Sequence, residues 1–268
     1  MRHHVIASIT LLVFMATAFS PVAVAQRGAG GTTPPAGPPH DPHDLSGVWL
    51  QRGGGSNQNP VSEWTRQPLP FTPAGKVAFE ARKPGKGPRA GLPAVGNDPL
   101  GDANVPGLLR TLVYARPFQF IHSQDKVVQL FEWFRIWREI WTDSRKMPED
   151  PGPRFYGYSV GRWEGDTFVV ETAGLDPRLW GDEWGMPFSE EMRVEERWRR
   201  LDRDNMELTL TLNDPQMYTK PWTSDPKRFR LQTKGMPNAE MLEVIFAPID
   251  EQDFNQKIRN PSNGVTVR

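Results

Sequence analysis

The chain contains no cysteine among its 268 residues, which excludes disulfide bonds, thiol catalysis and cysteine-based metal sites. It also has no excess of charge, because 32 basic side chains balance 32 acidic ones. A nucleic-acid surface would need a concentrated basic face, so this class of partner is not expected. No Gly-rich phosphate loop opens a predicted helix, so we expect no nucleotide cofactor. The protein must therefore hold itself together by burial of apolar side chains.

The one long hydrophobic run lies at the start of the chain. Residues 5–19 are apolar, and residues 23–25 (Ala-Val-Ala) then supply the small-x-small pattern of a cleavage site. We predict a secretory signal over residues 1–25 and a periplasmic or secreted protein with no membrane span after cleavage. The alternative is an uncleaved anchor, since the run is almost long enough to cross a bilayer, but Pro21 and the cleavage pattern argue against it. Removal of 25 residues would leave 243, enough for one large β domain or two small ones.

Two stretches rich in Gly and Pro divide the rest of the chain. Residues 26–44 have almost nothing apolar to bury and are predicted to form a disordered spacer. His40 and His43 lie three apart in this spacer, but no other metal ligand is near them, so we interpret them as a solvated tail and expect no metal site. Residues 83–107 form a connection that is long for the inside of a domain, and such a loop often serves as a lid over a cavity.

Residues 158–172 (YSVGRWEGDTFVVET) are the most informative stretch, and we interpret them as a β-hairpin. Glu164, Gly165 and Asp166 form the turn between two runs of strand-forming residues. The same alternation of strand formers and turn residues recurs along the chain. It predicts further strands over residues 45–49, 117–122, 126–133, 134–142, 192–201, 206–212, 229–233 and 241–246.

These strands predict a mainly β fold with little helix. Only residues 73–82 favour a helix, with Thr72 as N-cap and Pro73 in the first helical position. We expect an antiparallel meander of about nine or ten strands that forms a single β-barrel or β-sandwich domain over residues 45–248. Residues 249–268 are expected to be a polar C-terminal tail.

One predicted strand carries a carboxylate on its inward face. Val194, Glu196 and Trp198 share that face, because side chains alternate at period two along a strand. An inward carboxylate is costly unless it is paired, hydrogen-bonded or exposed to a wet cavity. A structural ion pair with Arg162 or Arg200, a bulge that turns the side chain outward, a ligand contact and a catalytic role all remain open.

Few catalytic constellations can be built from the predicted fold. His122 is the only histidine in its folded part, which argues against an all-protein zinc site, because such sites commonly use two or three histidines. The Gly-x-Ser-x-Gly letters of residues 157–161 lie inside a strand and do not form a nucleophile elbow. Acid–base chemistry without a cofactor remains, or glycoside hydrolysis if two carboxylates share a cavity. The candidate catalytic residues are Glu196, Tyr158, Arg162, Glu171 and His122, whereas Asp166 is interpreted as a turn residue.

The chain is rich in aromatic residues, with 10 Trp and 14 Phe. They supply either a large aromatic core or an aromatic-lined cavity. Trp133, Trp137 and Trp141 lie four apart, which would also suit a helix face, but their β-branched and aromatic neighbours favour strands. The candidate ligand-binding residues are Trp133, Trp137, Trp163 and Trp198.

Five motifs cover most of residues 45–223. They are LSGVW (45–49), EWFRIWREIWTD (132–143), GYSVGRWEGDTFVVET (157–172), SEEMRVEERWRR (189–200) and PWT (221–223). In these motifs the chain resembles a family of uncharacterised exported bacterial proteins, which brings no established activity. The family pattern has a His where this chain has Phe188, and it includes cysteines. If that His serves chemistry in the family, this protein has lost or altered the activity.

A looser resemblance is to lipocalin-like barrels, whose first strand carries a Gly-x-Trp as in residues 47–49. That resemblance implies a central cavity for an apolar or amphipathic ligand. Our first hypothesis is therefore a barrel that binds a lipid, terpenoid or aromatic molecule. The alternatives are a cofactor-independent hydrolase, lyase or isomerase that uses Glu196 with Tyr158 or Arg162, and a carbohydrate-binding module that uses exposed Trp.

Overall fold

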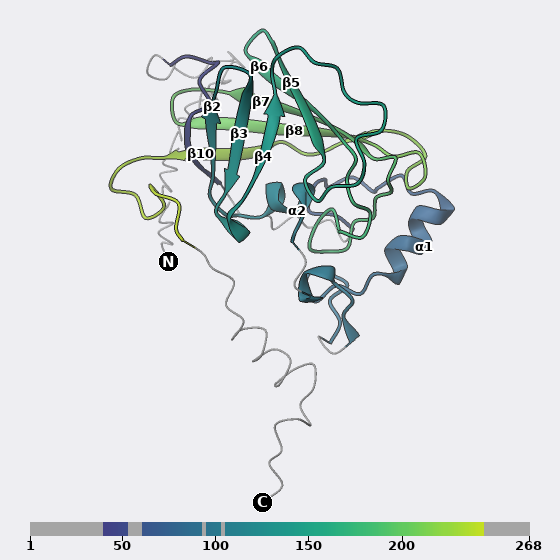
Figure 1. The fold of residues 1–268 in the computed structure, drawn as a ribbon. Coiled ribbons are helices and arrows are strands. Elements are labelled where there is room, and N and C mark those ends of the chain that lie inside the picture. The colour runs from purple at the N-terminus through teal and green to yellow at the C-terminus, as the bar shows by residue number, and fades with distance from the viewer. Residues whose placement is uncertain (1–39, 53–60, 93–94, 103–104, 244–268) are drawn as a thin grey trace, which may run out of the picture. The chain divides into compact units, whose positions relative to one another are not determined.

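The computed structural model describes residues 40–52, 61–92, 95–102 and 105–243 (Figure 1). The predicted secretory signal, the spacer up to residue 39 and the predicted C-terminal tail lie outside these ranges. Within them the chain is mainly β, as the sequence predicts. No helix of the described part has the length and apolar character needed to cross a membrane.

The described part of the chain contains ten strands, nine of which close into a β-barrel. The strands are β1 (Gly47–Gln51), β2 (Phe118–His122), β3 (Lys126–Phe131), β4 (Ile136–Trp141), β5 (Tyr158–Glu164), β6 (Thr167–Ala173), β7 (Arg193–Arg200), β8 (Asn205–Asn213), β9 (Trp222–Thr223) and β10 (Lys227–Gln232). Neighbours pair in the order β10-β1-β2-β3-β4-β5-β6-β7-β8, and β10 also pairs with β8 and completes the ring. β9 pairs with β8 outside this ring. Figure 1 shows β2 to β5 crossing in front of β8 and β10 at a steep angle.

The helices lie outside the ring of strands (Figure 1). They are α1 (Pro73–Ala81), α2 (Leu108–Val113) and the 3-10 turns η2 (Pro99–Asp102) and η3 (Trp133–Arg135). The predicted start of α1 is confirmed, because the Thr72 hydroxyl accepts a hydrogen bond from the Gly75 N–H at 2.9 Å. The sequence did not predict α2, whose six residues are all buried.

One junction makes the barrel a mixed one, whereas the sequence predicted an antiparallel meander. β4 and β5 run parallel and pair at only two positions, Ile140 with Ser159 and Trp141 with Val160. A parallel pair cannot be joined by a hairpin, because the chain must first return to the starting end of the sheet. Residues 142–157, which include three prolines, make that return. β4 and β5 are therefore the most weakly paired neighbours in the ring.

The predicted strands 126–133 and 134–142 are shortened by a tight turn. Phe134 (φ +62°) and Arg135 (φ +51°) adopt the left-handed conformation, which is unfavourable for residues other than glycine and ends strand geometry. The last predicted strand, residues 241–246, is described only up to residue 243 and forms no strand there. β10 closes the barrel instead, by pairing with both β1 and β8.

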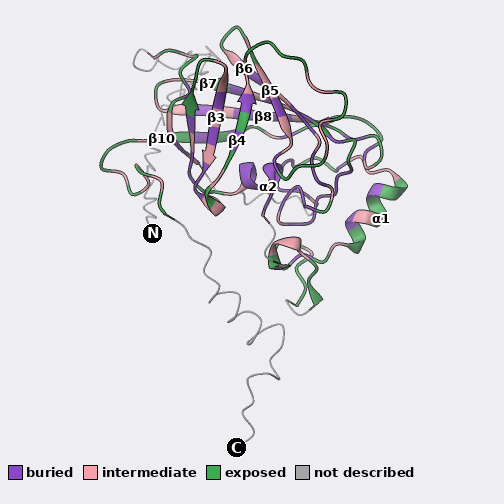
Figure 2. Ribbon diagram, in the orientation of Figure 1, coloured by how far each residue is buried: buried purple, intermediate pink, exposed green. Residues whose placement is uncertain are grey.

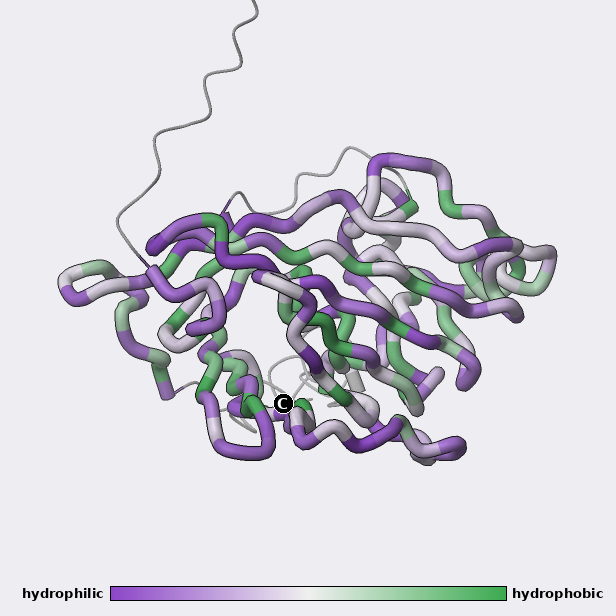
Figure 3. Tube along the Cα trace, turned by 90° about the horizontal axis from the view of Figure 1, so that it is seen from above, coloured by the Kyte–Doolittle hydropathy of each residue, from purple (hydrophilic) through white to green (hydrophobic). Residues whose placement is uncertain are grey.

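Side chains from facing strands fill the barrel interior. Leu208, Leu210 and Leu212 are fully buried, as the alternation along β8 predicts. Figure 2 shows buried residues recurring along the strands, and Figure 3 shows hydrophilic and hydrophobic residues alternating along the chain. Beside them lies an aromatic cluster with neighbouring ring centroids 5.1 to 5.6 Å apart, formed by Phe118, Phe120, Trp198 and Phe229. These rings occupy the centre of the barrel, where the lipocalin resemblance implied a ligand cavity.

Candidate functional site

Glu196 points into the barrel, as predicted, and is held there by an ion pair. Arg138 of β4 donates to both carboxylate oxygens across the interior, with Nη1 to Oε1 at 2.6 Å and Nη2 to Oε2 at 2.5 Å. Both side chains are at most 2% exposed. The predicted ion pair is therefore present, but the prediction of Arg162 or Arg200 as its partner was wrong.

A shell of hydrogen bonds completes this pair. Trp198 Nε1 donates to Glu196 Oε2 at 2.9 Å, and Arg138 Nε donates to Gln129 Oε1 at 2.8 Å. Thr172 adds a longer bond of 3.4 Å to Glu196 Oε1. A carboxylate held in this way has both oxygens engaged and no exposed surface. This geometry makes Glu196 a structural tether between the two walls of the barrel.

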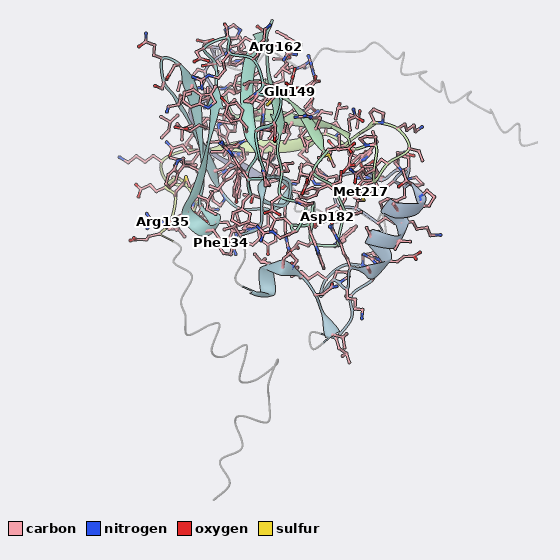
Figure 4. All side chains as sticks on the ribbon, turned by 45° about the vertical axis from the view of Figure 1, so that its right-hand side comes forward. Phe134, Arg135, Glu149, Arg162, Asp182 and Met217 are labelled. Atoms are coloured by element: carbon pink, nitrogen blue, oxygen red, sulfur yellow. The ribbon has the colours of Figure 1, made fainter. Side chains whose placement is uncertain are left out.

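The catalytic partners proposed for Glu196 lie on the outer face of the sheet. Alternation along β5 turns Ser159 inward and Tyr158 and Arg162 outward. Arg162 Nη1 donates to Glu171 Oε1 at 2.5 Å, and both side chains are nearly half exposed. Figure 4 shows Arg162 near the upper end of the strands. Neither Tyr158 nor Arg162 contacts Glu196, so the predicted catalytic pairing is corrected.

His122 and Trp163 contact the residues that precede β1. His122 Nε2 accepts a hydrogen bond from the Leu45 N–H at 3.1 Å, and burial lowers the pKa of this imidazole. The Trp163 ring stacks on His43, with centroids 4.3 Å apart, and His43 Nε2 also contacts the Gly165 carbonyl at 2.9 Å. His43, which the sequence placed in a solvated spacer, thus packs against the turn of the hairpin.

A crevice of about 320 Å³ opens on the barrel wall where β4 and β5 meet. We call it the junction crevice. Trp137 is 62% exposed and Phe155 is 38% exposed, which are high values for large aromatic side chains. The polar lining includes Arg138, Ser159 and Arg154. Its aromatic lining consists of Trp137, Trp141, Phe155, Tyr156 and Tyr158.

The short parallel pairing of β4 and β5 explains the position of the crevice. The residues of β4 that precede Ile140 have no pairing partner on β5, so inward side chains such as Arg138 reach the wall of the crevice. The chain before β5 packs directly on β6. At Gly157 (φ +66°) the two segments are so close that a Cβ would lie 2.5 Å from Thr172 Cγ2. Tyr156 is buried behind this segment, and its hydroxyl lies 3.0 Å from Thr111 Oγ1. Burial raises the pKa of Tyr156 to about 12, so the phenol stays neutral.

A second cavity, of about 370 Å³, is lined by charged residues, and we call it the charged cavity. The connection of residues 83–107, predicted as a lid, supplies one wall through Lys86 and Asp98. Arg110 of α2 binds Asp98 with two bonds of 2.7 and 2.8 Å, and Lys86 Nζ lies 2.9 Å from Glu183 Oε1. Every charge named here is therefore balanced by a partner.

Two buried carboxylates lie beside the charged cavity, and the sequence predicted neither of them as a site residue. The Asp182 carboxylate accepts hydrogen bonds from three backbone N–H groups, those of Glu63, Trp184 and Met186, at 2.9 to 3.0 Å. Glu63 Oε2 accepts from the N–H of Glu183, which lines the cavity. Burial, with a contribution from the negative charge of Asp182, raises the pKa of Glu63 to about 7. Figure 4 shows Asp182 well below Arg162.

The other tryptophans proposed as ligand contacts are engaged by protein side chains. Trp198 is fully buried in the aromatic cluster, and Trp133 stacks on Tyr114 with centroids 4.1 Å apart. Only Trp137, of the four, lines the junction crevice. Among the described residues, no group of three His, Cys, Asp or Glu side chains converges in a way that could hold a metal ion.

Arg138, Arg154 and Phe155 are among the crevice residues that the sequence did not predict as site residues. Alternation along β4 offered a signal for Arg138, because it places this cation on the same inward face as Ile140. Residues 154 and 155 follow a Pro-rich loop, where no periodicity guides a prediction. Comparison with known proteins adds no assignment, because no family model, curated protein or solved structure matches the chain.

Proposed function

We propose that this protein binds a small aromatic molecule in the junction crevice. The observation that carries the proposal is Trp137, whose indole stands 62% exposed among four other aromatic side chains that line the same hollow. Apolar surface gathered in a concave site is typical of ligand binding, and a bound ring would remove it from water. The binding site is thus a gap in the barrel wall and not the central cavity that the sequence suggested.

The volume of the crevice narrows the ligand class. Ligand pockets begin at about 300 Å³, so the 320 Å³ of the crevice falls at the small end of the range. An engineered cavity of about 150 Å³ holds one benzene molecule. The crevice therefore suits a molecule of one or two rings, and a long acyl chain would leave much of its length in water.

The buried network behind the crevice supports binding by keeping its wall rigid. Arg138 lines the crevice and is held on the inner side by Glu196 and Gln129. A side chain fixed by several partners loses little conformational entropy when a ligand arrives. The site is therefore largely formed before binding.

Calorimetric titration with a neutral two-ring probe, 2-naphthamide, tests the proposal. We expect saturable binding that weakens about tenfold in Trp137→Ala, because stacking and apolar burial by one ring are worth about 1–2 kcal/mol. Trp163→Ala serves as the matched control, since Trp163 stacks on His43 outside the crevice lining. Absence of binding, or equal losses in both variants, contradicts the proposal. Retention on insoluble polysaccharide that depends on Trp137 would support a carbohydrate-binding module instead.

Export is part of the proposal. Its support is the predicted secretory signal over residues 1–25, with the cleavage pattern Ala-Val-Ala at residues 23–25. In a bacterial host the full chain should appear in the periplasm or medium with Gln26 as its first residue, as measured by fractionation and intact-mass spectrometry. Full-length chain retained in the cytoplasm contradicts this part.

A second candidate function is acid–base catalysis without a cofactor beside the charged cavity, where Glu63 contacts Glu183 of the cavity lining. Glu63 favours it, because a carboxyl group with a pKa of about 7 exchanges protons readily at neutral pH. Turnover of a chromogenic ester or glycoside panel by the wild type should fall at least about 100-fold in Glu63→Gln. No turnover by the wild type, or turnover that survives the substitution, removes this candidate.

A further inference from the structure

The charges around the junction crevice are balanced, with one exception. Arg138 is neutralised by Glu196 at 2.5 Å. Glu139, which also lines the crevice, accepts from Lys126 Nζ at 2.6 Å. Each of these pairs contributes no net charge to the crevice. A further charged side chain without a partner would therefore set the sign of the electrostatic potential in the crevice.

Arg145 and Asp143 form a third balanced pair nearby. Arg145 Nη2 lies 2.5 Å from Asp143 Oδ2, and Arg145 Nη1 donates to the Tyr158 hydroxyl at 3.2 Å. This cation is therefore also compensated, and it positions Tyr158 at the edge of the crevice.

Arg154 is the uncompensated cation. Its side chain is exposed, lines the crevice and has no acidic partner among the described residues. Its guanidinium carbon lies 5.4 Å from the centroid of the Tyr158 ring, which holds the group beside the aromatic lining. The nearby Asp176 is taken by Arg178, whose Nη2 lies 2.5 Å from Asp176 Oδ2.

The backbone of Arg154 is anchored, whereas its side chain makes no ion pair. The Arg154 N–H donates to the Gly174 carbonyl at 2.8 Å, and the Arg154 carbonyl accepts from the Asp176 N–H at 3.0 Å. The base of the side chain is thus fixed to the end of β6. A fixed base with a guanidinium that lacks a counter-charge is suited to receive an anion.

We propose that the ligand of the junction crevice is an aromatic carboxylate, whose ring packs on Trp137 while its carboxylate binds Arg154. This inference rests on the proposed function, since it names the chemical class of the molecule bound at that site. A guanidinium presents parallel N–H groups that match a carboxylate, and such charge-assisted bonds are stronger than neutral ones. The balanced pairs around the crevice offer no competing counter-charge for a cationic ligand.

Three isosteric probes separate the inference from the proposed function. In calorimetric titrations at low salt, we expect 2-naphthoate to bind about tenfold more tightly than 2-naphthamide, and 2-naphthylmethylamine to bind most weakly. The advantage of the carboxylate should shrink at high ionic strength, because an exposed charge is screened. If the amide binds and the carboxylate binds no better, the inference is overturned while the proposed function stands. If no probe binds, the proposed function itself fails.

Variants assign the preference to Arg154. Arg154→Met should abolish the advantage of 2-naphthoate over 2-naphthamide when both probes are titrated against the same variant, whereas Arg154→Lys, which keeps the charge but not the planar fork, should retain part of it. Arg199→Met is the matched control, because it removes an exposed positive charge of β7 that does not line the crevice. An equal loss in the Arg154 and Arg199 variants would show a general charge effect and overturn the inference.

Discussion

The ion pair between Arg138 and Glu196 should be one of the most sensitive points of the fold. Arg138→Met removes both charge-assisted bonds of 2.5 and 2.6 Å and leaves the Glu196 carboxylate with the Trp198 N–H and a weak contact to Thr172. Loss of one partner from a buried pair costs about 3–5 kcal/mol. Since domains are stable by only about 5–15 kcal/mol, we expect a large part of the stability to disappear.

A double-mutant cycle isolates the interaction between the two charges. Glu196→Leu should cost a similar amount, because it strands the guanidinium of Arg138 in the barrel. The double variant should lose only about 2–4 kcal/mol, since no charge is left buried and the remaining cost comes from the orphaned Trp198 N–H and Gln129 carbonyl. The coupling energy between the two sites should therefore reach about 4 kcal/mol.

Urea unfolding, followed by far-UV circular dichroism and extrapolated linearly to water, measures these values. The pair of Arg162 and Glu171 is a matched control, because its 2.5 Å contact is as short but nearly half of each side chain is exposed. Arg162→Met should cost at most about 1 kcal/mol. Additive losses at Arg138 and Glu196, or losses no larger than at Arg162, would refute the idea that burial makes this ion pair strong.

Three further predictions concern other parts of the chain. Burial and the charge of Asp182 raise the pKa of Glu63 from 4.5 to about 7, so the contribution of Glu63 to stability is complete below pH 4.5 and lost as the pH rises through 7. In urea titrations, the free energy of unfolding of Glu63→Gln should match that of the wild type at pH 4.5 and exceed it by at most about 3 kcal/mol at pH 8. A difference that does not change with pH would contradict this. Ser144 has φ +64° and is exposed, so Ser144→Gly should raise the free energy of unfolding by up to about 1 kcal/mol while Ser144→Ala gives no gain. Thr72→Ala should lower it by about 1 kcal/mol because the Gly75 N–H loses its acceptor, and Thr72→Ser should restore it; equal stability of both variants would argue against the cap.

Local patterns in the sequence predicted much of the fold. The hairpin of β5 and β6, the inward face of β8 and the N-cap of α1 are present as expected, because each depends on residues within a few positions of one another. The boundaries of β3 and β4 were less accurate. The left-handed residues Phe134 and Arg135 between them carry no sequence signal, since neither is a glycine.

Local sequence patterns did not predict the junction crevice. The crevice exists because β5 pairs in parallel with β4 at only two positions. This pairing follows from the path of residues 142–157, and the sequence of neither strand indicates it. Trp137 precedes that path on β4, whereas Arg154 lies near the end of it. Their meeting in one crevice could not be predicted from the residues around either of them.

Glu196 illustrates the same division within one residue. Its inward direction follows from the period of two along β7, a property of the covalent chain and its pleat, and the sequence was sufficient to predict it. Its partner Arg138 lies 58 residues away on a strand that does not pair with β7, and only closure of the barrel brings the two together. Side-chain direction is a local consequence of backbone geometry, whereas contact across an interior depends on the order and register of every strand between.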